Sequence, residues 1–201
     1  YETLKQFQNK QSEYEDYIDW FKTLPLFYET DSFRAVHACW GHNNIQFLKN
    51  TLVNDKLTDE LIYQSVKKDS ALFTAIEETL KGKEIKMPKG LSFTDKDGSI
   101  RSEIRTKWWE NPAAMTYKSI SVIPLDNLPD TPIETTDLSK SDYYKSDDKF
   151  VFFGHYWLKG VPSICKKNVC CLDYSVAKEG KLVAYRLDHE SELDNSKLIF
   201  V

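Results

Sequence analysis

The pattern of hydrophobic and polar positions predicts helices in the first 82 residues. Over residues 1–24, apolar side chains recur mostly at steps of three and four residues among Gln, Glu, Lys and Asp, which is the spacing of one helix face. Pro25 ends this pattern. Further helical patterns cover residues 43–52, 59–65 and 70–80. The last of these has Ser70 as its expected N-cap and Gly82 as its expected stop.

Short apolar runs predict strands before and after these helices. The expected strands are residues 26–28 and 33–38 near the start, and 150–153, 169–172 and 182–187 in the last third, where Lys178-Glu179-Gly180 predicts a hairpin turn. Strands that alternate with helices predict the α/β class. We expect one domain over residues 1–201, in which residues 82–149 form an irregular hairpin and loop insertion.

A hairpin is expected at the start of this insertion. Residues 91–94 and 99–109 flank the turn Asp95–Gly98. On the second strand, alternate positions from Ile100 to Trp108 share one face, and positions from Arg101 to Lys107 share the other. One face can pack while the other presents guanidinium groups. The proline-rich residues 110–149 predict a long irregular connection over the surface.

Composition narrows the class of protein. A hydrophobic fraction of 41% and a charged fraction of 29% are typical of globular domains. The net charge of −4 and the absence of long Lys/Arg runs argue against nucleic-acid or membrane-surface binding. No apolar run reaches the roughly 20 residues of a membrane helix. Because the chain begins at Tyr1, we do not expect a complete translation product.

The four cysteines indicate a reduced, cytoplasmic protein. No C-x-x-C spacing occurs, and the spacing disfavours a disulfide framework. Cys170 and Cys171 are adjacent, so on a strand they would point to opposite faces. A structural zinc site built from cysteines and histidines has poor spacing and is the least favoured alternative.

Two of the four histidines follow short apolar strands. His37 follows residues 33–36, and His155 follows residues 150–153 through Gly154. The plain interpretation of each is a histidine that hydrogen-bonds a neighbouring backbone group. Gly154, however, permits a close backbone approach or an unusual backbone angle, which suits a crowded site. His42 and His189 are interpreted as loop histidines without a role.

Five segments carry a resemblance to a known family. They resemble, in this order, the later part of a calcineurin-like metallophosphoesterase, and are most similar to bacterial serine/threonine-phosphatase-like and diadenosine-tetraphosphatase-like members. The segments are WFKTLPL (20–26), FRAVHA (33–38), FFGHYW (152–157), NVCCLDYS (168–175) and GKLVAYR (180–186).

The resemblance implies a fold and a metal centre. It implies a two-sheet β-sandwich flanked by helices, with a dinuclear centre of Mn, Fe, Zn or Ni ions, for which His37 and His155 are metal ligands. Residues 169–175 and 180–186 would be scaffold in a closing hairpin. The family's Asp-x-His, Gly-Asp and Gly-Asn-His motifs do not occur in this chain. We therefore expect the carboxyl-terminal portion of such a domain, incomplete at its amino-terminal side.

The expected function is hydrolysis of phosphoric esters, by a metal-dependent phosphatase present here as its carboxyl-terminal portion. Arg105 is the candidate catalytic residue that would contact the anionic phosphoryl group, with Arg101 and Lys107 as substitutes. The alternative interpretation of these three residues is a basic face that is only solvated. Phosphoproteins, dinucleoside polyphosphates and small phosphomonoesters remain open as substrates. The alternative function is a catalytically inactive phosphatase-like protein-interaction module that associates through exposed edges and aromatic side chains. We expect Trp108-Trp109 to pack rather than to stack on a nucleotide.

Overall fold

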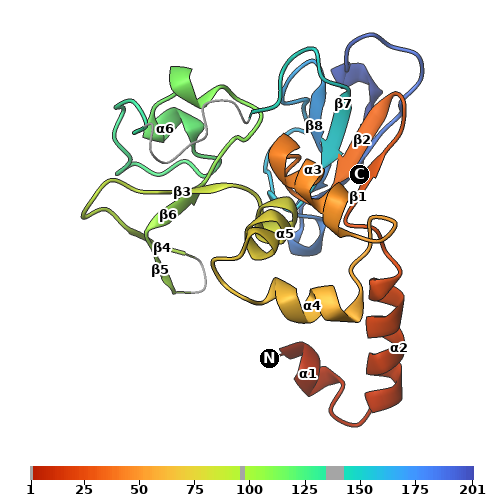
Figure 1. Cartoon of the computed structure of the whole chain (residues 1–201). Helices are drawn as coiled ribbons and strands as arrows, with labels where there is room; N and C mark the ends of the chain where they lie inside the picture. Colours follow the sequence, from red (N-terminus) through yellow and green to blue (C-terminus); the bar gives the residue numbers. More distant parts are fainter. Residues whose placement is uncertain (1, 96–97, 135–142) are drawn as a thin grey trace.

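The computed structural model describes residues 2–95, 98–134 and 143–201 (Figure 1). Over these ranges the chain is mixed α/β, with six α-helices and several small sheets, which confirms the predicted class. Three short 3-10 helices, Pro112–Ala114, Val176–Lys178 and Asn195–Lys197, lie in the connections.

A four-stranded sheet with the order β1-β2-β7-β8 forms the centre. Its strands are β1 (Phe27–Glu29), β2 (Phe33–Val36), β7 (Phe150–Phe153) and β8 (Val169–Cys171). β1 is antiparallel to β2, whereas β2, β7 and β8 are mutually parallel. The expected strands are confirmed here, although β2 and β8 end earlier than predicted. β7 and β8 have unbroken apolar sequences because both faces of these strands are buried.

Helices cover one face of this sheet. α3 (His42–Thr51), α4 (Asp59–Ser65) and α5 (Ala71–Lys81) follow β2 in the chain. Leu48 of α3 and Ala75 of α5 belong to the same buried cluster as Val151 and Phe153 of β7. The predicted ends of α5 are confirmed, because the Ser70 hydroxyl accepts from the Phe73 N–H at 3.1 Å and Gly82 ends the helix with φ 90°.

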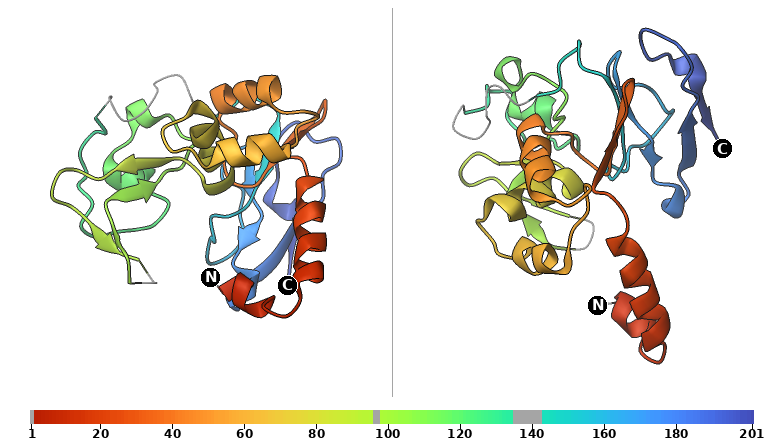
Figure 2. Two further views of the ribbon diagram at one scale, coloured as in Figure 1. Left: turned by 60° about the horizontal axis from the view of Figure 1, so that its bottom comes forward. Right: turned by 45° about the vertical axis from the view of Figure 1, so that its right-hand side comes forward.

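A second sheet covers the other face (Figure 2). It consists of β9 (Asp173–Tyr174), β10 (Lys181–Tyr185) and β11 (Leu198–Phe200), in the order β11-β10-β9. Phe152 and Cys170 pack against Tyr174 and Val183, whereas Cys171 lies in the cluster on the helix side. The prediction that Cys170 and Cys171 point to opposite faces is therefore confirmed.

The predicted strand over residues 99–109 is divided in two. β5 (Ile100–Arg101) pairs with β4 (Phe93–Thr94), and β6 (Glu103–Arg105) pairs with β3 (Glu84–Lys86). Ile104 is buried as expected, but Ile100 is 77% exposed, so the prediction of one continuous packed face was wrong. The reason is that the chain changes its strand partner at Ser102. Part of the predicted turn, residues 96–97, lies outside the described residues.

The connection after this hairpin has its own small core. α6 (Tyr117–Ile120) begins with a capping box between Thr116 and Ser119. Tyr117 and Ile120 pack with Leu128 and with strand residues of the hairpin. Apart from α6 and one short 3-10 helix, the described connection is irregular, as expected, but its placement at the surface was wrong for the buried side chains, because these apolar residues pack against β3 and β6. Residues 135–142 of this predicted connection lie outside the described residues.

The amino-terminal helical pattern forms two helices. α1 (Glu2–Gln6) and α2 (Gln11–Lys22) are separated by a turn, where one helix over residues 1–24 was expected. The turn lets the Phe7 ring contact Tyr14 and Tyr17, with ring centroids 5.5 and 5.8 Å apart. Neither helix buries a residue, and both stand away from the rest of the chain (Figures 1 and 2). In the described part of the chain, no helix has the length and apolarity to cross a membrane.

Candidate functional site

The His37 and His155 imidazoles meet at the carboxyl ends of two neighbouring parallel strands. β2 and β7 pair with Val36 opposite Phe153, and the Gly154 N–H donates to the His37 carbonyl at 2.9 Å. This register places both histidines one or two residues beyond the sheet. His37 Nε2 lies 3.3 Å from His155 Nδ1, and the ring centroids are 5.0 Å apart. The expectation that these distant histidines meet is confirmed.

The unusual backbone angle belongs to His155 itself. His155 has φ 66° and Trp157 has φ 48°, both in the left-handed region that is costly for residues with a Cβ. At Gly154, by contrast, an added Cβ would make ordinary contacts, the nearest at 3.5 Å from the His37 carbonyl oxygen. The prediction that Gly154 provides the close approach or the unusual backbone angle was therefore wrong, because the unusual angles are those of His155 and Trp157. The left-handed turn directs the His155 ring back toward His37.

Asp173 holds this turn, and the sequence interpretation treated it only as scaffold. Its Oδ2 accepts from the Trp157 N–H at 3.4 Å, and its carbonyl accepts from the Leu158 N–H at 2.9 Å. Asp173 follows β8, the next parallel strand after β7. The rule that singled out His37 and His155, a polar residue at the end of a buried strand, would have found it.

Arg105 lies beside His155, as the candidate role requires. Its Nη1 donates to the His155 carbonyl at 3.3 Å, and its guanidinium lies 5.4 Å from the Tyr156 ring centroid. Its Nη2 is 3.5 Å from Glu84, and its buried Nε has no hydrogen-bond partner among the described residues. Arg105 is the last residue of β6, and the Tyr156 hydroxyl donates to the carbonyl of the next residue, Thr106, at 3.2 Å, which holds this end of the strand beside the loop that carries His155.

The two substitutes for Arg105 point elsewhere. Arg101 donates from Nε to Asp95 at 2.8 Å, and Lys107 donates to the Ser119 carbonyl at 2.8 Å. Arg105 is therefore the member of this polar face that contacts a predicted site residue. Trp108 and Trp109 are both buried, which confirms that they pack.

His42 was wrongly assigned to a loop. It is the first residue of α3, its Nε2 lies 3.1 Å from Asp148 Oδ2, and its ring stacks on Tyr144 with centroids 5.5 Å apart. His189 does lie in a loop and is exposed. Neither histidine belongs to the pair at the strand ends.

The environment keeps His155 neutral. Burial lowers the pKa of His155 first, and the nearby Arg105 and His37 lower it further, to about 4, against an opposing effect of Asp173. At neutral pH the ring therefore carries no charge. Neutral imidazole is the form that binds a metal ion through a ring nitrogen.

The imidazole pair fits two ligands of one metal ion. Nitrogens about 2.0–2.1 Å from a common ion, at the tetrahedral angle, lie roughly 3.3 Å apart, which matches the separation of 3.3 Å between His37 and His155. The same separation also fits a hydrogen bond in which one ring donates to the other. Within residues 2–95, 98–134 and 143–201, no group of three or more His, Cys, Asp or Glu side chains is placed to hold a metal. The pair by itself offers two possible ligand atoms, which is fewer than such a group needs.

Comparison of the chain with protein families, with curated proteins and with solved structures finds no match in any of the three.

Proposed function

We propose that this chain is the carboxyl-terminal portion of a metal-dependent phosphoesterase, a hydrolase in which His37 and His155 bind a metal ion. The observation that carries the proposal is the 3.3 Å separation of two ring nitrogens that come from the ends of adjacent parallel strands. Loops at the carboxyl ends of such strands are where α/β folds place ligands. The two facing sheets support a phosphoesterase-like sandwich with helices on its outer side, incomplete at the amino-terminal side.

The remaining metal ligands would come from an upstream segment. The Asp-x-His, Gly-Asp and Gly-Asn-His motifs that supply them in the resembling family do not occur in this chain. Two divalent ions, drawn from Mn, Fe, Zn or Ni, would supply an activated water and stabilise the oxygens of the phosphoryl group.

The chain's own residues have positioning roles in this proposal. The Asp173 carboxylate and carbonyl fix the turn that aims the His155 ring. Arg105, whose Nη1 donates to the His155 carbonyl, is a cation beside the imidazole pair that could contact a phosphoryl oxygen. The Arg105 side chain lies in the lining of a pocket beside His155, and this position supports the role because a guanidinium binds phosphoryl oxygens through charge-assisted hydrogen bonds.

Isothermal titration calorimetry with Zn²⁺ and Mn²⁺ tests the metal site. His37→Ala and His155→Ala should each weaken binding by more than about tenfold, because each removes one of the chain's two direct ligands. His189→Ala is the matched control and should leave the affinity unchanged. Equal affinities in all four proteins would overturn the assignment.

Activity requires the upstream segment. A protein that joins this chain to a segment with the three absent motifs should hydrolyse p-nitrophenyl phosphate when manganese is present. Absence of turnover with every divalent metal would contradict the phosphoesterase proposal while leaving the metal site intact.

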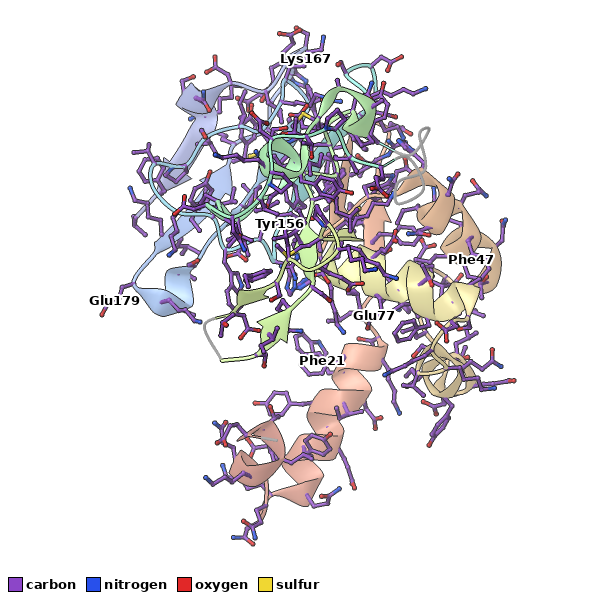
Figure 3. The ribbon with its side chains drawn as sticks, turned by 90° about the vertical axis from the view of Figure 1, so that its left-hand side faces the viewer. Phe21, Phe47, Glu77, Tyr156, Lys167 and Glu179 are labelled. Atoms are coloured by element: carbon purple, nitrogen blue, oxygen red, sulfur yellow. The ribbon has the colours of Figure 1, made fainter. Side chains whose placement is uncertain are left out.

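A second candidate is a catalytically inactive interaction module. The observation that favours it is the aromatic surface of α2, where Tyr17, Trp20 and Phe21 are exposed and no residue is buried. Figure 3 shows Phe21 on this helix. Exposed aromatic side chains are typical of protein interfaces. Silence in the metal titration, together with association that Trp20→Glu abolishes, would favour this candidate.

A further inference from the structure

A pocket of about 840 Å³ opens next to His155. Four separate parts of the chain line it: Arg105, residues 122–123, the loop 155–161, and residues 174–175 with 178–181 around the β9–β10 connection. Two of its lining residues, Tyr156 and Glu179, are labelled in Figure 3. Pockets of about 300–1,000 Å³ accommodate small organic ligands. Nothing in the proposed metal site accounts for this volume, because the imidazole pair touches the pocket only through His155.

The walls of the pocket are apolar. Ile123 and Trp157 are nearly half exposed, and Val161 is largely exposed, although all three are large hydrophobic side chains. Val122 and Leu158 complete this apolar lining. Neighbouring apolar side chains left open to solvent in one concave place are typical of a ligand-binding groove. An inorganic ion alone would gain nothing from such walls.

The pocket lining also carries positive charge. Arg105, Lys159, Lys178 and Lys181 line the pocket, against the single carboxylate of Glu179. Lys178 Nζ lies 4.5 Å from the centroid of the Trp157 ring. Positive charge beside apolar walls favours an anion and disfavours neutral or cationic compounds of the same shape.

We infer that this pocket binds aryl phosphates, with the aromatic ring against Trp157 and Ile123 and the phosphate toward Arg105 beside His155. The orientation is argued from two observations: Arg105 Nη1 contacts the His155 carbonyl, and the large exposed apolar side chains of the lining are Ile123, Trp157 and Val161. The binding site stands independently of catalysis. That aryl phosphates are the substrate class, in preference to alkyl phosphates, rests on the proposed function.

Calorimetry in the presence of EDTA tests the binding site separately from any metal chemistry. The probes are 1-naphthyl phosphate, cyclohexyl phosphate, 1-naphthol and inorganic phosphate. The first should bind at least about tenfold more tightly than each of the others, because it alone combines an aromatic ring with the anion. Equal binding of 1-naphthyl phosphate and inorganic phosphate would overturn the inference.

Variants locate the site. Trp157→Ala should weaken binding of 1-naphthyl phosphate by about tenfold. Trp20→Ala removes another exposed tryptophan, which is not among the residues that line the pocket, and should leave this binding unchanged. Lys178→Gln should weaken binding several-fold at low salt and less at high salt. Circular dichroism checks the folding of each variant, and Ile123→Asp serves if Trp157→Ala does not fold. Equal affinities in the pocket variants and in Trp20→Ala would refute the placement. If the binding results hold but the extended protein shows no turnover, only the proposed function fails.

Discussion

Glu29 is predicted to stabilise the strands that carry the two histidines. It lies on β1, where Arg34 Nε of β2 donates to it at 2.8 Å and Lys149 Nζ, just before β7, at 3.2 Å. Lys49 of α3 also donates to this carboxylate. The Glu29 side chain is 19% exposed. One carboxylate thus joins β1, β2, α3 and the start of β7.

The magnitude follows from the pKa of Glu29. Burial raises this pKa, but the hydrogen bonds from Lys49, Arg34 and Lys149 outweigh burial and lower it from 4.5 to about 2. At about 1.36 kcal/mol per pKa unit this corresponds to about 3 kcal/mol. Because Lys49 and Lys149 are 39% and 36% exposed, solvent screening reduces the expected contribution to about 1–2 kcal/mol.

The sign of the pH dependence is fixed by the direction of the shift. A carboxyl group whose pKa is lower in the folded than in the unfolded protein stabilises the folded protein. This stabilisation is complete above about pH 4.5, where the group is charged in both the folded and the unfolded protein. This contribution is lost as the pH falls from 4.5 toward 2. Glu29→Gln removes the charge at nearly constant volume, so its effect should follow the same window.

Urea denaturation at several pH values measures this effect. Glu29→Gln should lower the free energy of unfolding by about 1–2 kcal/mol at pH 7, and the difference from the unmodified protein should shrink toward zero near pH 2. Glu192→Gln is the control, because the Glu192–Lys167 ion pair is about half exposed on both sides and should contribute less than about 0.5 kcal/mol. A destabilisation by Glu29→Gln that stays constant from pH 7 to pH 3 would refute the reasoning.

Two further predictions concern the scaffold. Gly180→Ala should destabilise the protein by about 3 kcal/mol or more, because an added Cβ would overlap the Tyr174 carbonyl oxygen. Gly154→Ala, where an added Cβ makes only ordinary contacts, should cost less than about 1 kcal/mol. Thermal denaturation compares the two variants, and equal losses of stability would contradict the packing argument. The four cysteines are not in disulfides, and burial raises the pKa of Cys165 to about 11 and of Cys170 to about 12. Ellman's reagent should therefore modify them slowly in the native protein and rapidly in urea, and rapid native labelling of all four would show that the thiols are accessible.

Local signals in the sequence placed many of the elements. The helices over residues 59–65 and 70–80 were predicted nearly to the residue. Ser70 was the expected N-cap of the second helix, and the structure adds a similar hydroxyl cap at Thr58 for the first. The strands before His37 and His155 were predicted from apolar runs. Such signals depend only on neighbours along the chain, so they can be recognised in the sequence without knowledge of the fold.

Contacts between distant segments decided the rest. The division of residues 99–109 at Ser102 depends on which strand lies opposite, and the small core around Tyr117 forms only because β3 and β6 lie beside it. That His37 and His155 would meet was a sequence-based hypothesis, but the left-handed angle that turns His155 inward, and the Asp173 carboxylate that holds it, arise from tertiary contacts. Periodicity and capping residues specify local conformation, whereas strand partners, register and the direction of a side chain at a strand end are set by long-range packing, which one-dimensional patterns do not contain.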